Sequence, residues 1–356
     1  MRYYLLKEKI FEETYWCKQY IAGIKEEANR NKIKILENTE IDFSENGIVF
    51  LIATTNEFLN KIIEDNVYNK IKIIYIGPQV ELGSDYNSIM CDYNFLVKNA
   101  IKYCKDNNCN KILLYGVNPN SQGDLFFENT FKEEMLDDGY EFGKEKFDLD
   151  KQEALLLILQ NYDAILCCNM IIAKSLITQM KKISDKIPWV ISLLDSPLGQ
   201  YCTTDITTFI QNEREIGKQS VRLAISLKKN NNEVKVIWKT IPSIHVGETT
   251  DYVEYKISKA FSVQKVEEET NYFLNDRLVL DLLRCENLVA NLNDSDFEIL
   301  KYIGLNYTYS QMATLMNISE SNIKYRMKRL EKITKTESRK ELLNLLMKNV
   351  PKLVNP

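Results

Sequence analysis

Histidine and glycine are scarce in this sequence, and the two shortages exclude several kinds of site. His245 is the one histidine among 356 residues, so a zinc finger with two Cys and two His ligands cannot form. A Ser-His-Asp catalytic site would have to use this same residue, for which we expect a structural role. With 12 glycines and neither G-x-G-x-x-G nor G-x-x-x-x-G-K-[ST], the sequence has no recognisable phosphate-binding loop.

Paired cysteines and long apolar runs are also missing. The eight cysteines form no C-x-x-C and lie mostly in apolar runs, which indicates buried reduced thiols. The N-terminal "MRYYLLKEKIFEETYW" has charges where a signal peptide needs an apolar core. No apolar run approaches the roughly 20 residues of a membrane span, so we expect a cytoplasmic protein with no membrane partner.

Charge of the two signs is separated along the chain. Residues 318–356 contain ten Lys and Arg but four Glu, which leaves 36 basic and 46 acidic residues in 1–317. An acidic body followed by a basic tail predicts that the tail has an anionic partner.

The first 245 residues alternate short β-branched runs with helical patterns. This alternation predicts right-handed βαβ units around parallel sheets, an α/β architecture. We expect strands that are buried on both faces at 47–55, 71–78, 110–116, 162–169, 189–195 and 233–241. Because no nucleophile–base pair or metal cluster occurs with useful spacing, we do not expect an enzyme, a metal or a cofactor.

Residues 249–291 read as a helical connector. Apolar residues at helical spacing predict at least one amphipathic helix there, formed by Leu274, Leu278, Leu282, Leu283, Leu288 and Val289. Its apolar face packs either on the same chain or on a second copy, and the pattern does not distinguish the two.

Four helices are predicted in residues 292–356. Asp294 is expected to cap the first, Thr308 and Gln311 form a capping box that opens the second, and Ser319 caps the third. The third helix has Ile323, Met327 and Leu330 on one stripe, which should be buried, whereas Lys324, Lys328 and Lys332 lie along another ridge. A fourth helix should end before Pro351.

The segments "YSQMATLMNIS", "ESNIK" and the closing Arg339, Glu341 and Leu342 resemble the LuxR-type helix-turn-helix over residues 292–343. The resemblance implies that the third helix enters the major groove of double-stranded DNA. It implies DNA contacts by Ser321, Asn322, Lys324, Tyr325, Lys328 and Arg329. The stretch "SNIKYRMKRLEK" also resembles the promoter-reading region of sigma factors, so a sigma-like factor stays an alternative.

The stretch "VISLLDSPLGQYCTTDITTFIQNEREIGKQSVRLAI", supported by "YIAGIKEEANRNKIKIL" and "NYDAILCCNMIIAKSLI", resembles the sensor domain of lactose- and galactose-repressor (LacI/GalR) proteins. The resemblance implies a type 1 periplasmic-binding fold over residues 1–248, with two lobes formed by 1–108 with 212–232 and by 109–211 with 233–248. In that family the DNA-binding helices come first, whereas here they come last.

By the same resemblance, a small-molecule effector would bind between the lobes, in contact with Phe11, Thr14, Asp92, Phe127, Met170, Asp195 and Gln211. Phe127, or its neighbour Phe126, and Met170 replace polar groups that hold sugars in the family. Because a sugar needs several directional hydrogen bonds, we expect a flatter or more apolar effector. The alternative is a sensor domain that mediates protein contacts only.

Together these features predict a homodimeric DNA-binding transcriptional regulator, in which the sensor domain controls the C-terminal helices. A response regulator is disfavoured, because "ATTNEF" supplies no phosphorylatable Asp near residue 55.

Overall fold

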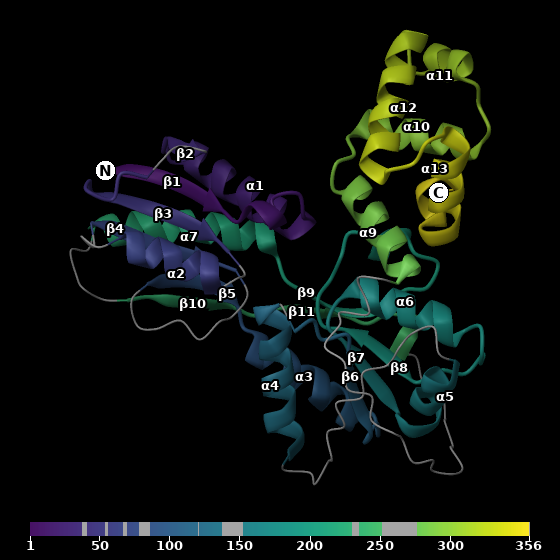
Figure 1. Cartoon of the computed structure of the whole chain (residues 1–356), viewed down its shortest axis with the longest axis horizontal. Coiled ribbons are helices and arrows are strands. Elements are labelled where there is room, and N and C mark those ends of the chain that lie inside the picture. The colour runs from purple at the N-terminus through teal and green to yellow at the C-terminus, as the bar shows by residue number, and fades with distance from the viewer. Residues whose placement is uncertain are drawn as a thin grey trace. The chain divides into compact units, whose positions relative to one another are not determined.

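The structure, a computed structural model, describes residues 1–37, 41–53, 56–66, 70–77, 86–119, 121–136, 152–229, 235–250 and 276–355. The chain divides into two compact units, each built around a mainly parallel sheet (Figure 1). Unit 1 comprises Met1–Asn108, Val117–Gly143 and Phe209–Ile244, and unit 2 comprises Cys109–Gly116, Lys144–Thr208 and His245–Pro356.

The sheet of unit 1 has the strand order β10-β5-β4-β3-β1-β2, with parallel neighbours throughout its described pairs. Its strands are β1 (Arg2–Lys7), β2 (Ile35–Glu37), β3 (Gly47–Ile52), β4 (Ile71–Ile76), β5 (Asn87–Cys91) and β10 (Ile237–Thr240). The accompanying helices are η1 (Lys9–Phe11), α1 (Tyr15–Arg30), α2 (Asn56–Asp65), α3 (Tyr93–Asp106), α4 (Gln122–Leu136) and α7 (Glu213–Lys229).

The second sheet has the order β11-β9-β8-β7-β6, and the neighbours from β6 to β9 are parallel. Its strands are β6 (Ile112–Tyr115), β7 (Ala164–Cys167), β8 (Trp189–Ser192), β9 (Thr207–Ile210) and β11 (Ser243–His245). The helices are α5 (Gln152–Asn161), α6 (Met170–Met180), η2 (Gly199–Tyr201) and η3 (Glu248–Thr250). Unit 2 continues into α9 (Arg277–Val289), α10 (Asp294–Gly304), α11 (Tyr309–Leu315), α12 (Glu320–Thr334), α13 (Arg339–Asn349) and η4 (Pro351–Leu353).

All six predicted strands form, but the strand predicted at 233–241 is not buried on both faces. It is shortened to β10 and lies at the edge of its sheet, where Ile237 is 63% exposed. An edge strand has a neighbour on one side only, and nothing in the β-branched pattern distinguishes an edge from a centre.

The lobe boundaries also differ from the prediction. β10 was expected in the second lobe, but it pairs with β5 in the first sheet. α4, also expected in the second lobe, packs on α3 within unit 1. The C-terminal helices group with the second sheet, because one apolar cluster runs through both.

The connector helix forms as α9, although Leu274 lies outside the described residues. Val279, Leu282, Cys285 and Leu288 are buried along one face of α9, which packs on α6, α12 and α13 of the same chain. Of the two alternatives, packing on the same chain or on a second copy, the apolar face of α9 therefore takes the first.

Two of the three capping predictions for the C-terminal helices are correct: Thr308 with Gln311 forms a capping box, and Ser319 caps α12. Ser338, for which no cap was predicted, caps α13. Asp294 does not cap α10. The cap is Asn293, whose side chain accepts the Asp296 N–H while the Asp296 carboxylate accepts the Asn293 N–H. Adjacent Asn and Asp residues offer equivalent short-range acceptors, so the sequence did not separate them.

In unit 1, α1 and α7 cross where each carries a glycine. A Cβ atom placed on Gly217 would lie 2.3 Å from the Tyr20 carbonyl oxygen, and one on Gly23 would lie 1.9 Å from the Arg214 carbonyl oxygen. The close approach of the two backbones therefore depends on hydrogen atoms at both positions.

Gly217→Ala should lower the free energy of unfolding by about 3 kcal/mol, because its methyl group overlaps backbone atoms that cannot move aside alone. Urea unfolding followed by circular dichroism measures the change. Gly199→Ala is the matched control, since its methyl group would lie 3.5 Å from its nearest neighbour, an ordinary contact. Equal effects of the two substitutions would contradict the helix-crossing argument.

Candidate functional site

The predicted DNA-facing helix, α12, is held by its apolar stripe. Ile323, Met327 and Leu330 are at most 1% exposed, as predicted. The opposite surface carries Lys324, Lys328 and Tyr325, and Tyr325 is 72% exposed. These three side chains therefore face solvent.

A short turn joins α11 to α12. Asn317 adopts a left-handed φ of 53°, which asparagine tolerates better than most residues. The Ile318 N–H donates to the Ala313 carbonyl and so closes the end of α11, after which Ser319 begins α12. The left-handed backbone at Asn317 and the Ser319 cap thus set the direction in which α12 leaves the turn.

Buried Asp296 binds two arginines of α12. Its carboxylate has no exposed surface and accepts from Arg326 Nη1 at 3.0 Å and from Arg329 Nη1 at 2.7 Å. Arg329 also donates through Nη2 to the Asn291 carbonyl at 2.7 Å. Sequence reasoning missed this network, which ties α12 to the start of α10.

The other predicted DNA contacts differ in their local partners. Ser321 and Asn322 lie exposed in the first turn, where Asn322 Oδ1 accepts from Arg326 Nε at 2.9 Å. Lys324 forms a surface ion pair with Glu320 at 2.7 Å, an interaction weak enough to exchange for a phosphate. Arg329 has strong partners within the chain, so its predicted DNA contact is the least favoured of the six.

In unit 1, three predicted effector residues follow the carboxyl ends of parallel strands. Phe11 and Thr14 come after β1, and Asp92 comes after β5. Parallel strands bring these ends to one edge of the sheet, the usual place for a ligand site. The Thr14 hydroxyl donates to the Phe11 carbonyl at 2.7 Å, and the Asp92 carboxylate caps α3 by accepting from the Phe95 N–H at 3.1 Å.

Trp16 is an additional candidate at this edge. Its ring lies 5.5 Å from that of Phe11 and 5.9 Å from that of Tyr20, so that the three form a continuous aromatic group. Phe11 and Trp16 keep part of their surface exposed, whereas Tyr20 is buried, which raises the pKa of its hydroxyl well above the usual value. The aromatic-rich segment "FEETYWCKQY" is the pattern in the sequence from which Trp16 could have been predicted.

Gln211 and Phe127 have contrasting environments. Gln211 directly follows β9 and is buried, and its Oε1 is among the few described buried side-chain atoms without a hydrogen-bond partner. An unpaired buried acceptor is costly and suits a ligand donor. Phe127 is fully buried, 4.6 Å from the Tyr93 ring, so its predicted effector contact is disfavoured; its neighbour Phe126 keeps some exposure.

In unit 2, Met170 and Asp195 meet beside Gly199. A Cβ atom on Gly199 would lie 3.5 Å from Met170 Cε and 3.8 Å from Asp195 Oδ1. Met170 is buried in the core and its N–H donates to the Leu194 carbonyl. Asp195 is open to solvent on one side, yet the protein atoms around its carboxyl raise its pKa by desolvation.

The described part of the chain contains a single histidine and no group of side chains arranged to hold a metal ion. His245 Nε2 lies 2.8 Å from an Asp205 carboxylate oxygen in an exposed pair. No three His, Cys, Asp or Glu side chains among the described residues are arranged as a metal site requires. The eight cysteines are buried thiols, as predicted. Of the helices described here, none has the length and apolar character needed to cross a bilayer.

Comparison with known proteins identifies the fold. Residues 101–250 match the family model for the periplasmic binding protein-like domain. No curated protein sequence matches the chain significantly.

Solved structures with low sequence identity share this fold. A LacI family transcriptional regulator from Bifidobacterium animalis subsp. lactis is 14% identical, with a TM-score of 0.56 over 70% of this chain and 97% of that one. A LacI family regulator, CCPA, from Weissella paramesenteroides with bound sucrose is 15% identical, with a TM-score of 0.53 over 70% and 98%. The lac repressor dimer bound to operator and an anti-inducer is 12% identical, with a TM-score of 0.55 over 70% and 93%.

The fold is therefore the α/β, two-lobed, periplasmic-binding-protein-like type, followed by C-terminal helices that fit a small all-α domain. The family match ends at residue 250, so the likeness of the C-terminal helices to LuxR-type proteins stays a prediction.

Asp296→Ala should lower the free energy of unfolding by about 2 kcal/mol, because it removes charge-assisted hydrogen bonds that hold α12 to α10. Thermal and urea unfolding of the full chain measure the loss. Asp294→Ala is the control, since Asp294 is an exposed acid in the same first turn and should change stability by less than about 1 kcal/mol. A smaller effect at Asp296 than at Asp294 would refute the assigned network.

Proposed function

We propose that this protein is a DNA-binding transcriptional regulator, in which the two-lobed domain senses a small molecule and α11 with α12 forms a helix-turn-helix. The observation that carries the proposal is the exposed face of α12, where Lys324, Lys328 and Tyr325 project from a helix anchored by a buried stripe. Lysines on such a face can neutralise phosphates while polar residues of the first turn reach base edges.

Charge supports the same proposal. The 39 residues from Ile318 carry ten basic and four acidic side chains, in a chain whose net charge is -4. Two of those ten, Arg326 and Arg329, are bound to Asp296. The lysines of α12 therefore form the main outward positive surface of this helix, and the acidic remainder of the chain would be repelled by DNA.

The sensor assignment is supported by the fold and by unit 1. The matched regulators and sugar-binding proteins share its architecture, and one of them has sucrose bound. In this chain the partly exposed Phe11 and Trp16 offer stacking surfaces, and Gln211 offers an unpaired acceptor. This chemistry suits a planar or largely apolar effector with a hydrogen-bond donor. Two copies would match the two-fold symmetry of most helix-turn-helix sites.

Lys324→Ala and Lys328→Ala should each weaken binding to a duplex selected from a random library, and each should lower the log–log salt slope by about one counterion. Fluorescence anisotropy at a series of salt concentrations measures both quantities. Lys340→Ala removes the same charge from an exposed position of α13 and should leave the slope unchanged. Failure of the full chain to select any duplex would refute DNA binding, and co-purification with core RNA polymerase would instead favour a sigma-like factor.

Glucose and galactose at millimolar concentration should leave the melting temperature of the full chain unchanged, because two groups that hold sugars are absent by resemblance. A planar heteroaromatic compound that binds would raise it, since a ligand at 100 times its Kd adds about 2.7 kcal/mol of stability. Differential scanning fluorimetry measures the shift. Clear stabilisation by either monosaccharide would overturn the proposed effector class.

A further inference from the structure

The loop that follows β8, Asp195–Cys202, is bonded to the connector helix α9. Ser196 Oγ donates to Glu286 Oε1 at 2.5 Å, a contact between residues 90 positions apart. Ser196 also organises its own loop, since its Oγ accepts from the Leu198 N–H and its carbonyl accepts from the Gly199 N–H. Ser196 therefore bonds within the loop and, through its hydroxyl, attaches the loop to α9.

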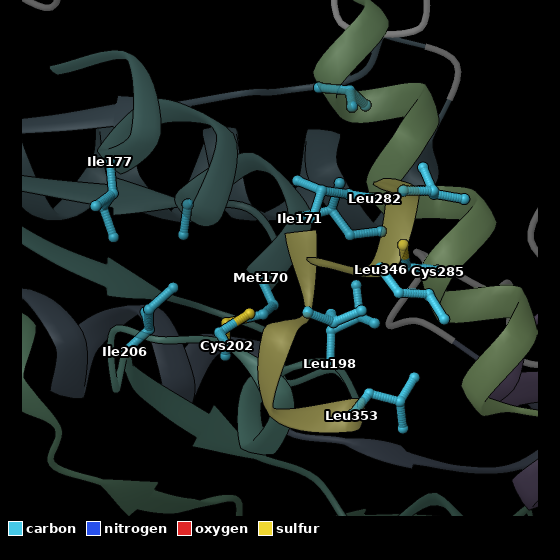
Figure 2. Close-up of a cluster of buried hydrophobic side chains, with 14 of the residues drawn as sticks. Met170, Ile171, Ile177, Leu198, Cys202, Ile206, Leu282, Cys285, Leu346 and Leu353 are labelled. Atoms are coloured by element: carbon cyan, nitrogen blue, oxygen red, sulfur yellow. The ribbon is translucent and has the colours of Figure 1, made fainter. Parts of the chain in front are cut away.

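Apolar contacts strengthen this attachment. Leu198 is 1% exposed and belongs to the same cluster as Leu282 and Cys285 of α9, Leu346 of α13 and Leu353 of η4. Figure 2 shows Leu198 between Met170 and Leu353 in this cluster. The loop thus packs on helices that also support α12.

The end of the loop makes a further contact with the C-terminal helices. η2, within the loop, packs on η4, and the Tyr201 ring stacks 6.1 Å from that of Phe297 in α10. α10 also carries Asp296, which binds the two arginines of α12. A continuous set of contacts therefore runs from the loop to the proposed DNA-facing helix.

The start of the loop carries a predicted effector residue. Asp195 precedes Ser196 directly, and Met170, the first residue of α6, donates its N–H to Leu194. α6 itself packs on α9. A change in the position of Asp195 would therefore be transmitted to Glu286 through a single residue, Ser196. The carboxylate of Asp195 is desolvated and would respond to a bound polar group.

We propose that the Asp195–Cys202 loop couples the effector site to the DNA-binding helices, with Ser196 as the positioning residue through its hydrogen bond to Glu286. The inference rests on the proposed function and adds the route of regulation. In the LacI-type domain order the DNA-binding helices precede the sensor, whereas here the C-terminal helices follow it. These helices pack directly on the loop after β8 of the sensor domain. Two sites coupled in this way influence one another reciprocally, so DNA binding must alter the loop.

Hydrogen–deuterium exchange of the full chain, with and without the selected duplex, tests the coupling. The amides of Leu198, Gly199, Tyr201 and Cys202 bond within the loop and report its opening. DNA should slow their exchange about fivefold or more in the natural sequence, the lower end of allosteric coupling factors. Ser196→Ala should still bind the duplex but show equal loop exchange in the free and bound states.

Two further variants separate coupling from a loss of stability. Glu286→Gln keeps an acceptor for Ser196 and should retain the DNA-dependent slowing. Ser184→Ala is the matched control, because Ser184 also bonds to the backbone two residues on, and its described side-chain hydrogen bonds both join it to Lys186 rather than to a C-terminal helix. General destabilisation by Ser196→Ala would speed exchange in both states and leave their ratio intact.

The outcomes distinguish the two proposals. Duplex binding with unchanged loop exchange in the natural sequence would overturn the coupling alone, as would full DNA-dependent slowing in Ser196→Ala. Absence of binding to any duplex, visible before exchange is measured, would overturn the proposed function and the coupling with it. Slowing that is lost in Ser196→Ala and kept in Glu286→Gln would support the coupling.

Discussion

One apolar cluster holds unit 2 together, and the proposed function depends on it. The cluster begins in the second sheet with Ile165, continues through Leu198 and α9, and reaches Leu330 of α12 and Val354 near the C-terminus. A bundle of roughly 65 residues buries little surface by itself, so shared packing with a sensor lobe adds to its stability. The same cluster includes Leu198 of the loop after β8 together with residues of the C-terminal helices.

Arginine and lysine of α12 have different tasks. Arg326 and Arg329 point to Asp296, where the fixed geometry of the guanidinium matches a carboxylate with no access to water. Lys324 and Lys328 remain exposed. The basic residues of α12 thus fall into two groups. The two arginines stabilise the fold through Asp296, and the lysines remain on the surface.

Predictions based on neighbouring residues were accurate except for the Asp294 cap, and those that needed distant residues were less so. The Thr308–Gln311 box, the Ser319 cap and the buried stripe of α12 follow from spacings of three or four residues, and all are confirmed. The exposure of β10 and the burial of Phe127 follow from which strand or helix lies beside them. No local pattern encodes that neighbour, so the prediction that the strand at 233–241 is buried on both faces was wrong. The effector contact of Phe127 is disfavoured by its burial and stays a prediction.

The sequence by itself determined the α/β class, the helical tail and its charge, because periodicity, caps and composition act over short distances. Only the tertiary structure decided which charged and polar groups have partners. It paired Arg329 with Asp296 and Ser196 with Glu286, and it left Gln211 Oε1 without a described partner. These pairings depend on contacts between residues far apart in the chain, which form only when the apolar cores bring the elements together.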